Sequence, residues 1–119
     1  MSTTADIDFR DTVPIDKIGV EERVARLNTR SIKKESKVQA LKLALSMVDL
    51  TTLEGSDSDG KVVQLCSKAR NPYAPMPDLP TVAAVCVYPN KVAVAKKSLE
   101  GTGIFVASVA TAFPSGMAP

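Results

Sequence analysis

The sequence predicts an α/β protein with parallel strands, and three observations lead to this fold class. Two stretches, TVAAVCVYP at 81–89 and IFVASVAT at 104–111, are continuous apolar runs of strand length. Continuous runs, unlike alternating ones, are typical of strands covered on both faces, as in a parallel sheet. The residues between them place Val92, Ala95 and Leu99 on one side and end in glycines, which indicates a helix. The order strand, helix, strand then predicts a right-handed βαβ unit.

The N-terminal part of the chain is predicted to be a tail followed by a helix. Residues 1–15 are polar and lack periodicity, so we expect a flexible tail. They show neither the basic nor the apolar segment of a signal peptide. From 16 to 29, apolar residues recur among charged ones, which predicts a short amphipathic helix whose apolar positions are Ile18, Val24 and Leu27.

Two more helices are predicted before the first strand. Residues 33–48 carry an apolar stripe at spacings of three and four, made of Val38, Leu41, Leu45 and Val48. This helix should stop at DLTTLEGSDSDG. The next helix should begin at Ser56 or Asp57, either of which can cap it, and should bury Val62, Cys66 and Ala69. The following NPYAPMPDLP contains four prolines and is predicted to be a loop.

The two predicted strands cannot bury their apolar faces by themselves. Parallel strands need neighbours at both edges and helices on both faces, and an unpaired edge favours association with another chain. The second strand is followed only by a short loop around FPSG. We therefore expect the chain to be the opening part of a larger α/β structure.

Composition narrows the classes of function. With 119 residues, 45% of them apolar, the chain is at most one globular domain. The net charge of +2 is too small to indicate a nucleic-acid or membrane partner, and no apolar run approaches the ~20 residues that span a bilayer. The densest basic group is expected to be a solvated helix face: Arg30, Lys33, Lys34 and Lys37. We expect a soluble, cytoplasmic protein.

Histidine is absent, and neither cysteine lies in a metal-binding pattern. The absence of histidine excludes Ser-His and Cys-His nucleophiles and most zinc sites. Cys66 and Cys86 each lie within an apolar pattern without CxxC spacing, which favours reduced, packed thiols.

Three stretches, in this order, resemble one enzyme family. They are VDLTTLEG, AAVCVYP and VASVATAFPSG, and the similarity covers roughly residues 31–119. This pattern resembles deoxyribose-phosphate aldolase, a class I aldolase family that cleaves 2-deoxyribose 5-phosphate into glyceraldehyde 3-phosphate and acetaldehyde. The resemblance implies a lysine Schiff base, a phosphosugar substrate and no cofactor.

The resemblance also implies the fold, a (β/α)8 TIM barrel. Residues 16–119 would be N-terminal helices followed by the first two barrel strands, Val82–Tyr88 and Val106–Thr111. The helices before Val82 would pack outside the barrel. In such barrels function lies at the carboxyl ends of the strands, so CVYPN and TAFPSG would face the mouth of the site.

The catalytic amine is not expected in this chain. A free lysine titrates near ~10.4, so a Schiff-base lysine must be buried or placed near another cation. Neither predicted strand contains a lysine. The resemblance implies that the Schiff-base lysine, a second lysine and a catalytic aspartate lie on later strands.

Four residues match the family's binding residues. Asp49 would bind substrate and join a proton relay; its alternative role is a cap at a helix end. Thr51 would lie near the sugar hydroxyl, or form a turn. Cys86 would line the substrate pocket, or only pack inside the barrel. Phe113 would line the mouth as an aromatic wall, or pack without a functional role.

Two hypotheses follow for the whole chain. In the first, the chain is the N-terminal segment of a deoxyribose-phosphate aldolase, and this segment is active only with the rest of the barrel. The second is a non-catalytic binding or assembly module, a pseudoenzyme that pairs through its open sheet edge with another copy or another protein.

Overall fold

The computed structural model describes residues 13–117. The predicted tail at 1–15 therefore lies largely outside the described residues. The chain divides into two compact units, residues 1–32 and 33–119. The first contains α1, Lys17–Asn28, which begins where the Gly19 amide donates to the Asp16 carboxylate at 3.0 Å. The helix predicted at 16–29 is thus confirmed.

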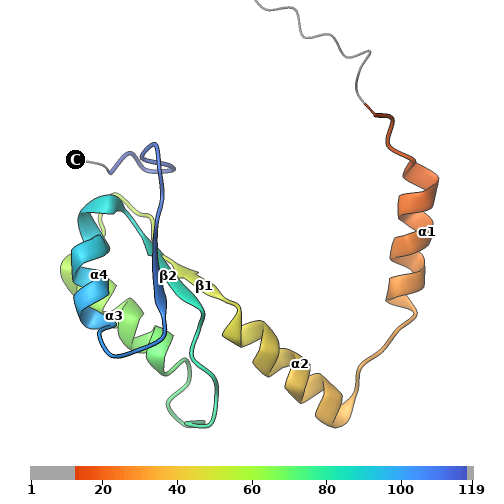
Figure 1. Ribbon diagram of the computed structural model, residues 1–119, viewed down its shortest axis with the longest axis horizontal. Coiled ribbons are helices and arrows are strands. Elements are labelled where there is room, and N and C mark those ends of the chain that lie inside the picture. The colour runs from red at the N-terminus through yellow and green to blue at the C-terminus, as the bar shows by residue number, and fades with distance from the viewer. Residues whose placement is uncertain (1–12, 118–119) are drawn as a thin grey trace, which may run out of the picture. The chain divides into compact units, whose positions relative to one another are not determined.

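The second unit is a three-stranded parallel sheet with helices (Figure 1). The strand order is β1-β2-β3, so β2 is central. In chain order, the elements of this second unit are α2 (Lys34–Ser46), β1 (Asp49–Thr51), α3 (Asp59–Arg70), β2 (Ala84–Val87), the 3-10 turn η2 (Pro89–Lys91), α4 (Val92–Ser98) and β3 (Phe105–Ser108).

The strand β1 corrects the sequence prediction, which placed DLTTL at the end of a helix. The Ala84 amide donates to the Val48 carbonyl at 3.3 Å, and the Thr52 amide donates to the Cys86 carbonyl at 3.1 Å. These bonds extend the ladder beyond the three residues of the strand. Consequently β2 is the second strand of the sheet and not the first, and α3 is the crossover of an additional βαβ unit.

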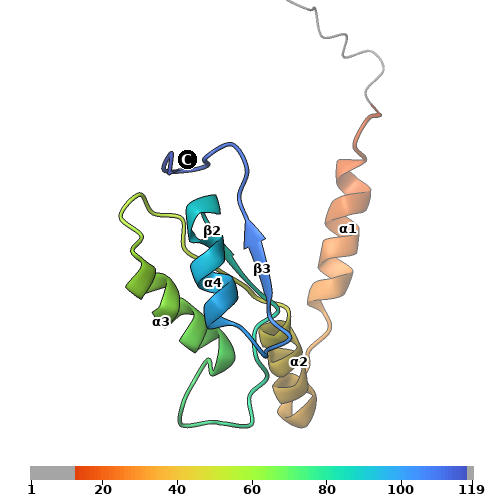
Figure 2. The same ribbon diagram turned by 60° about the vertical axis from the view of Figure 1, so that its left-hand side comes forward.

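One face of the sheet is covered by α3 and α4, which lie side by side (Figure 2). Val85 and Val87 of β2 are fully buried against these helices. The predicted buried faces of both helices are confirmed. The buried apolar core consists of Val62, Cys66, Ala69, Val82, Val85, Val87, Ala95, Leu99 and Ile104.

The opposite face of the sheet, called the open face here, carries side chains from all three strands. Since successive strand residues point to opposite sides, the residues between the buried valines project away from the helices. The pairing register then defines the open face as Asp49, Thr51, Ala84, Cys86, Phe105 and Ala107. Phe105 is 75% exposed, so the prediction that the last strand is covered on both faces is wrong within the described chain.

The predicted apolar stripe of α2 is partly buried only at and just beyond the carboxyl end of the helix. Leu45 and Val48 pack against the core, whereas Leu41 is 61% exposed. The helix ends at Ser46 and not at Val48, because the chain turns there into β1.

Candidate functional site

Three of the four predicted site residues meet on the open face. Thr51 and Cys86 are paired in register, and Asp49 precedes Thr51 by two residues on the same side of β1. Asp49 and Thr51 are exposed, whereas Cys86 is only 8% exposed. A carboxylate, a hydroxyl and a thiol thus lie on the same face of β1 and β2, with Asp49 at the start of β1 and Thr51 at its carboxyl end.

The surroundings of Cys86 disfavour the charged form of its thiol. Burial raises the pKa of Cys86, and the negative charge of Asp49 raises it further, while a hydrogen bond with Thr51 acts in the opposite direction. Only the thiolate reacts readily, so the raised pKa makes Cys86 less reactive than a free thiol. A thiol that is kept in its neutral form is poorly suited to covalent catalysis.

Substitution of Asp49 by asparagine is expected to speed alkylation of Cys86 at pH 8. Loss of the neighbouring charge lowers the pKa of the thiol and enlarges the thiolate fraction. Iodoacetamide labelling, followed by peptide mass spectrometry, measures both cysteines in one sample. Cys66, which is packed in the helix-covered core, is the internal control and should not change. Equal rates for Cys86 in both proteins would contradict this placement of Asp49.

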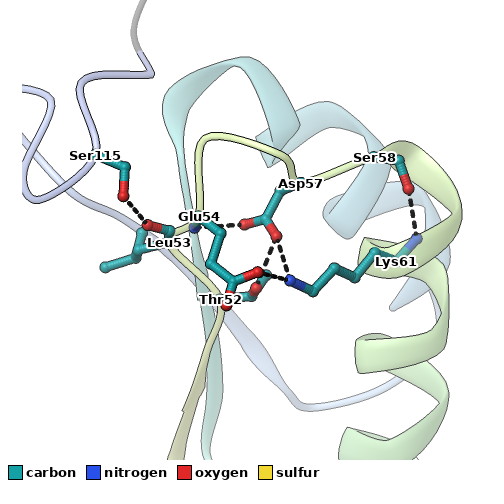
Figure 3. Close-up of polar contacts among 7 residues, drawn as sticks. All are labelled: Thr52, Leu53, Glu54, Asp57, Ser58, Lys61 and Ser115. Carbon is teal, nitrogen blue, oxygen red and sulfur yellow. Dashed lines mark hydrogen bonds and ion pairs between the residues drawn. The ribbon is translucent and has the colours of Figure 1, made fainter.

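The loop after β1 is held by a buried carboxylate, Asp57 (Figure 3). Its side chain is 1% exposed. It accepts a hydrogen bond from the Thr52 hydroxyl at 2.9 Å and one from the Glu54 amide at 3.0 Å. The ammonium of Lys61 lies 2.8 Å from the same carboxylate and also contacts Glu54. This set of contacts fixes residues 52–61.

The charge of Asp57 is kept by its partners. Burial by itself would raise the pKa of Asp57, but the hydrogen bonds from Lys61, the Glu54 amide and Thr52, together with the positive charge of Lys61, lower it below 3.8. The sequence predicted Asp57 or Ser56 as the cap of α3. The cap is Ser58, whose hydroxyl accepts from the Lys61 amide at 3.2 Å.

The stabilising effect of Asp57 should disappear in acid. Its folded-state pKa lies below the unfolded value near 3.8, so the unfolded chain takes up the proton first as the pH falls. The contribution is therefore complete above about pH 5 and is lost as the pH falls through the folded-state pKa. The difference in unfolding free energy between the wild type and Asp57→Asn should shrink between pH 6 and about pH 3. If the difference in unfolding free energy between the two proteins stays constant over this pH range, the lowered pKa of Asp57 is contradicted.

The remaining predicted site residue, Phe113, comes from the loop after β3 and is 67% exposed. This loop is tied to the segments that follow the other two strands, β1 and β2. The Ser115 amide donates to the Tyr88 hydroxyl at 2.6 Å, and the Ser115 hydroxyl donates to the Leu53 carbonyl at 2.9 Å. No local pattern predicts these contacts, because the bonded residues are 27 and 62 positions apart in the sequence.

The lysines near the strand ends are unsuited to form a Schiff base. Hydrogen bonds to Asp57 and then to Glu54 raise the pKa of Lys61, which is opposite to what an amine nucleophile needs. Lys91 is paired with Asp59 at 2.8 Å. The three strands contain no lysine.

Residues 13–117 contain neither a cluster of metal ligands nor a helix that could span a membrane. No group of three or more histidine, cysteine or acidic side chains there is arranged to hold a metal ion. No helix in the same range combines the length and the apolar character needed to cross a membrane.

The chain matches no family model but is similar to several curated proteins. Deoxyribose-phosphate aldolase of Mus musculus is 40% identical over 125 residues, which is 96% of this chain and 39% of the mouse protein. The proteins of the same name from Homo sapiens and Bos taurus are each 37% identical, over 96% and 95% of this chain and 39% of their own length. The chain therefore spans about two fifths of these relatives. It resembles deoxyribose-phosphate aldolase along nearly its whole length, in keeping with the N-terminal portion of that protein.

Proposed function

We propose that this chain supplies part of the substrate site of a 2-deoxy-D-ribose 5-phosphate aldolase. The reaction is the reversible cleavage of that sugar phosphate into D-glyceraldehyde 3-phosphate and acetaldehyde. The observation that carries the proposal is the similarity to three aldolases over 95–96% of the chain. The arrangement of Asp49, Thr51 and Cys86 on one open face supports it.

The chemistry divides between this chain and the rest of a (β/α)8 barrel. A lysine on a later strand forms the Schiff base with the aldehyde carbon of the substrate and releases water. The bond between C2 and C3 then breaks as the C3 hydroxyl loses its proton, which releases glyceraldehyde 3-phosphate and leaves an enamine. The C2 carbon takes up a proton, and water hydrolyses the resulting iminium to release acetaldehyde and the free lysine. Such proton transfers need a positioned acid or base.

Each of the four predicted site residues has a role in this scheme. Asp49 accepts and returns a proton as part of a relay, and its exposed carboxylate lies free to reach a ligand. The Thr51 hydroxyl binds a sugar hydroxyl beside it. Cys86 lines the pocket as a neutral thiol, and Phe113 forms an aromatic wall at the mouth.

The direct test is reconstitution. The chain is mixed with a polypeptide that supplies the remaining barrel strands from a full-length relative, or is fused to it, and cleavage of 2-deoxyribose 5-phosphate is assayed. We expect activity in the assembly and none in either part alone. A stable assembly that does not cleave the substrate would contradict the proposal.

An assembly module is the second candidate, and the exposed Phe105 on the edge strand β3 favours it. In this case the open edge pairs with another copy of the chain. Light scattering should then show dimers or larger species. A monomer whose β3 amides are protected from hydrogen exchange would argue against pairing.

A further inference from the structure

The loop between β3 and the C-terminal segment is held in a strained conformation. Thr111 and Ala112 have φ angles of 60° and 57°, a left-handed region that is unfavourable for residues with a Cβ atom. Gly116, with φ at 79°, closes the loop by donating its amide to the Ala112 carbonyl at 2.8 Å. Strain of this kind persists only where surrounding contacts fix the backbone. It is also frequent in segments that shape binding sites.

The contacts that fix this loop come from Tyr88 and Ser115, called the clamp here. Tyr88 is fully buried at the end of β2, and its hydroxyl accepts a hydrogen bond from the Ser115 amide at 2.6 Å. A buried tyrosine hydroxyl normally requires such a partner. The Ser115 hydroxyl reaches the carbonyl of Leu53, after β1, at 2.9 Å (Figure 3). One serine thus joins the loop after β3 to the carboxyl ends of both other strands.

We propose that Tyr88 and Ser115 are positioning residues that fix the loop 111–116, and with it Phe113, as one wall of the substrate mouth. The inference rests on the proposed function for the identity of the substrate. Asp57 supports the clamp from the other side, because its contacts with Thr52 and the Glu54 amide flank Leu53. The loop therefore cannot shift without breaking contacts at the carboxyl ends of both other strands.

Amide hydrogen exchange tests the clamp directly in the 119-residue chain. In Tyr88→Phe the Ser115 amide loses its acceptor while the ring stays buried. Hydrogen exchange of the Ser115 amide should become about fivefold faster, which corresponds to the loss of one neutral hydrogen bond. Tyr73→Phe is the matched control, since Tyr73 is 56% exposed in the proline-rich loop, and it should leave this amide unchanged. If exchange of the Ser115 amide is unaltered in Tyr88→Phe, or changes equally in Tyr73→Phe, then Tyr88 does not hold this loop.

A fluorescent reporter tests whether the clamp positions residue 113. The sequence has no tryptophan, so Phe113→Trp introduces a single one. Adding Tyr88→Phe or Ser115→Ala should lower the fluorescence anisotropy of this tryptophan and increase its quenching by acrylamide. Circular dichroism checks that the fold is kept. Equal anisotropy with and without the clamp residues would show that they do not position the side chain.

The activity of the reconstituted aldolase tests the role of the loop in binding. Tyr88→Phe and Ser115→Ala should each raise KM about fivefold and change kcat by less than about twofold, because the loop binds substrate and takes no part in proton transfer. An unchanged KM together with a loosened loop would overturn the binding role. Inactivity of the unsubstituted assembly would instead contradict the proposed function, and the exchange result would still decide whether the clamp exists.

Discussion

Replacing Asp57 with alanine is expected to lower the free energy of unfolding by about 3 kcal/mol. The Asp57 carboxylate is the acceptor for the Thr52 hydroxyl and the Glu54 amide, and Thr52 is only 8% exposed. Without the acceptor, each buried or half-buried donor loses its partner, at a cost of about 1–3 kcal/mol. Urea unfolding followed by circular dichroism measures the change.

The control for this substitution is Asp78→Ala. Asp78 is exposed in the proline-rich loop, so its removal should change the free energy of unfolding by less than about 0.5 kcal/mol. Lys61→Met offers a second comparison, because it removes the contact with the ammonium group and leaves the hydrogen bonds from Thr52 and the Glu54 amide to Asp57 in place. Equal destabilisation by Asp57→Ala and Asp78→Ala would show that the buried carboxylate does not organise the loop after β1.

Replacing Asp49 with asparagine in the reconstituted aldolase is expected to reduce kcat about 100-fold, with a smaller effect on KM. Asparagine keeps the size of the side chain and its ability to accept a hydrogen bond, but it does not take up a proton. Because Asp49 is exposed, the stability of the chain should change little. Steady-state kinetics of deoxyribose phosphate cleavage, with circular dichroism of the variant chain, measures both effects.

The matched control is Asp78→Asn, the same change of charge at a loop position, which should leave kcat and KM unaltered. A second comparison is Thr51→Val. This substitution removes the neighbouring hydroxyl and should raise KM more than it lowers kcat. Full activity of Asp49→Asn would exclude the relay role and leave Asp49 as a surface carboxylate at the start of β1.

The longer elements were predictable from the sequence because their burial is encoded locally. The apolar run around Val85 and Val87 and the spacing of Ala95 and Leu99 each identify one element, and the structure confirms both. By contrast, β1 has three residues, too few for any periodicity, and it exists because the backbone of β2 pairs with it.

The candidate site was only partly predictable for the same reason. The resemblance identified Asp49, Thr51 and Cys86, but their common face depends on the register between β1 and β2. Nothing local distinguishes the buried Asp57 from the exposed Asp59, since burial at this point is decided by how the loop folds over the sheet.

The central claim is that the Schiff-base lysine lies outside this chain, and the most direct test of it is to trap the Schiff base. Sodium borohydride is added to the reconstituted assembly during turnover of 2-deoxyribose 5-phosphate, and mass spectrometry locates the reduced adduct. We expect the adduct on a lysine of the added barrel segment and none on this chain, where Lys61 is held protonated by Asp57 and Glu54. An adduct on any lysine of the 119-residue chain, or cleavage by that purified chain alone, would contradict the account.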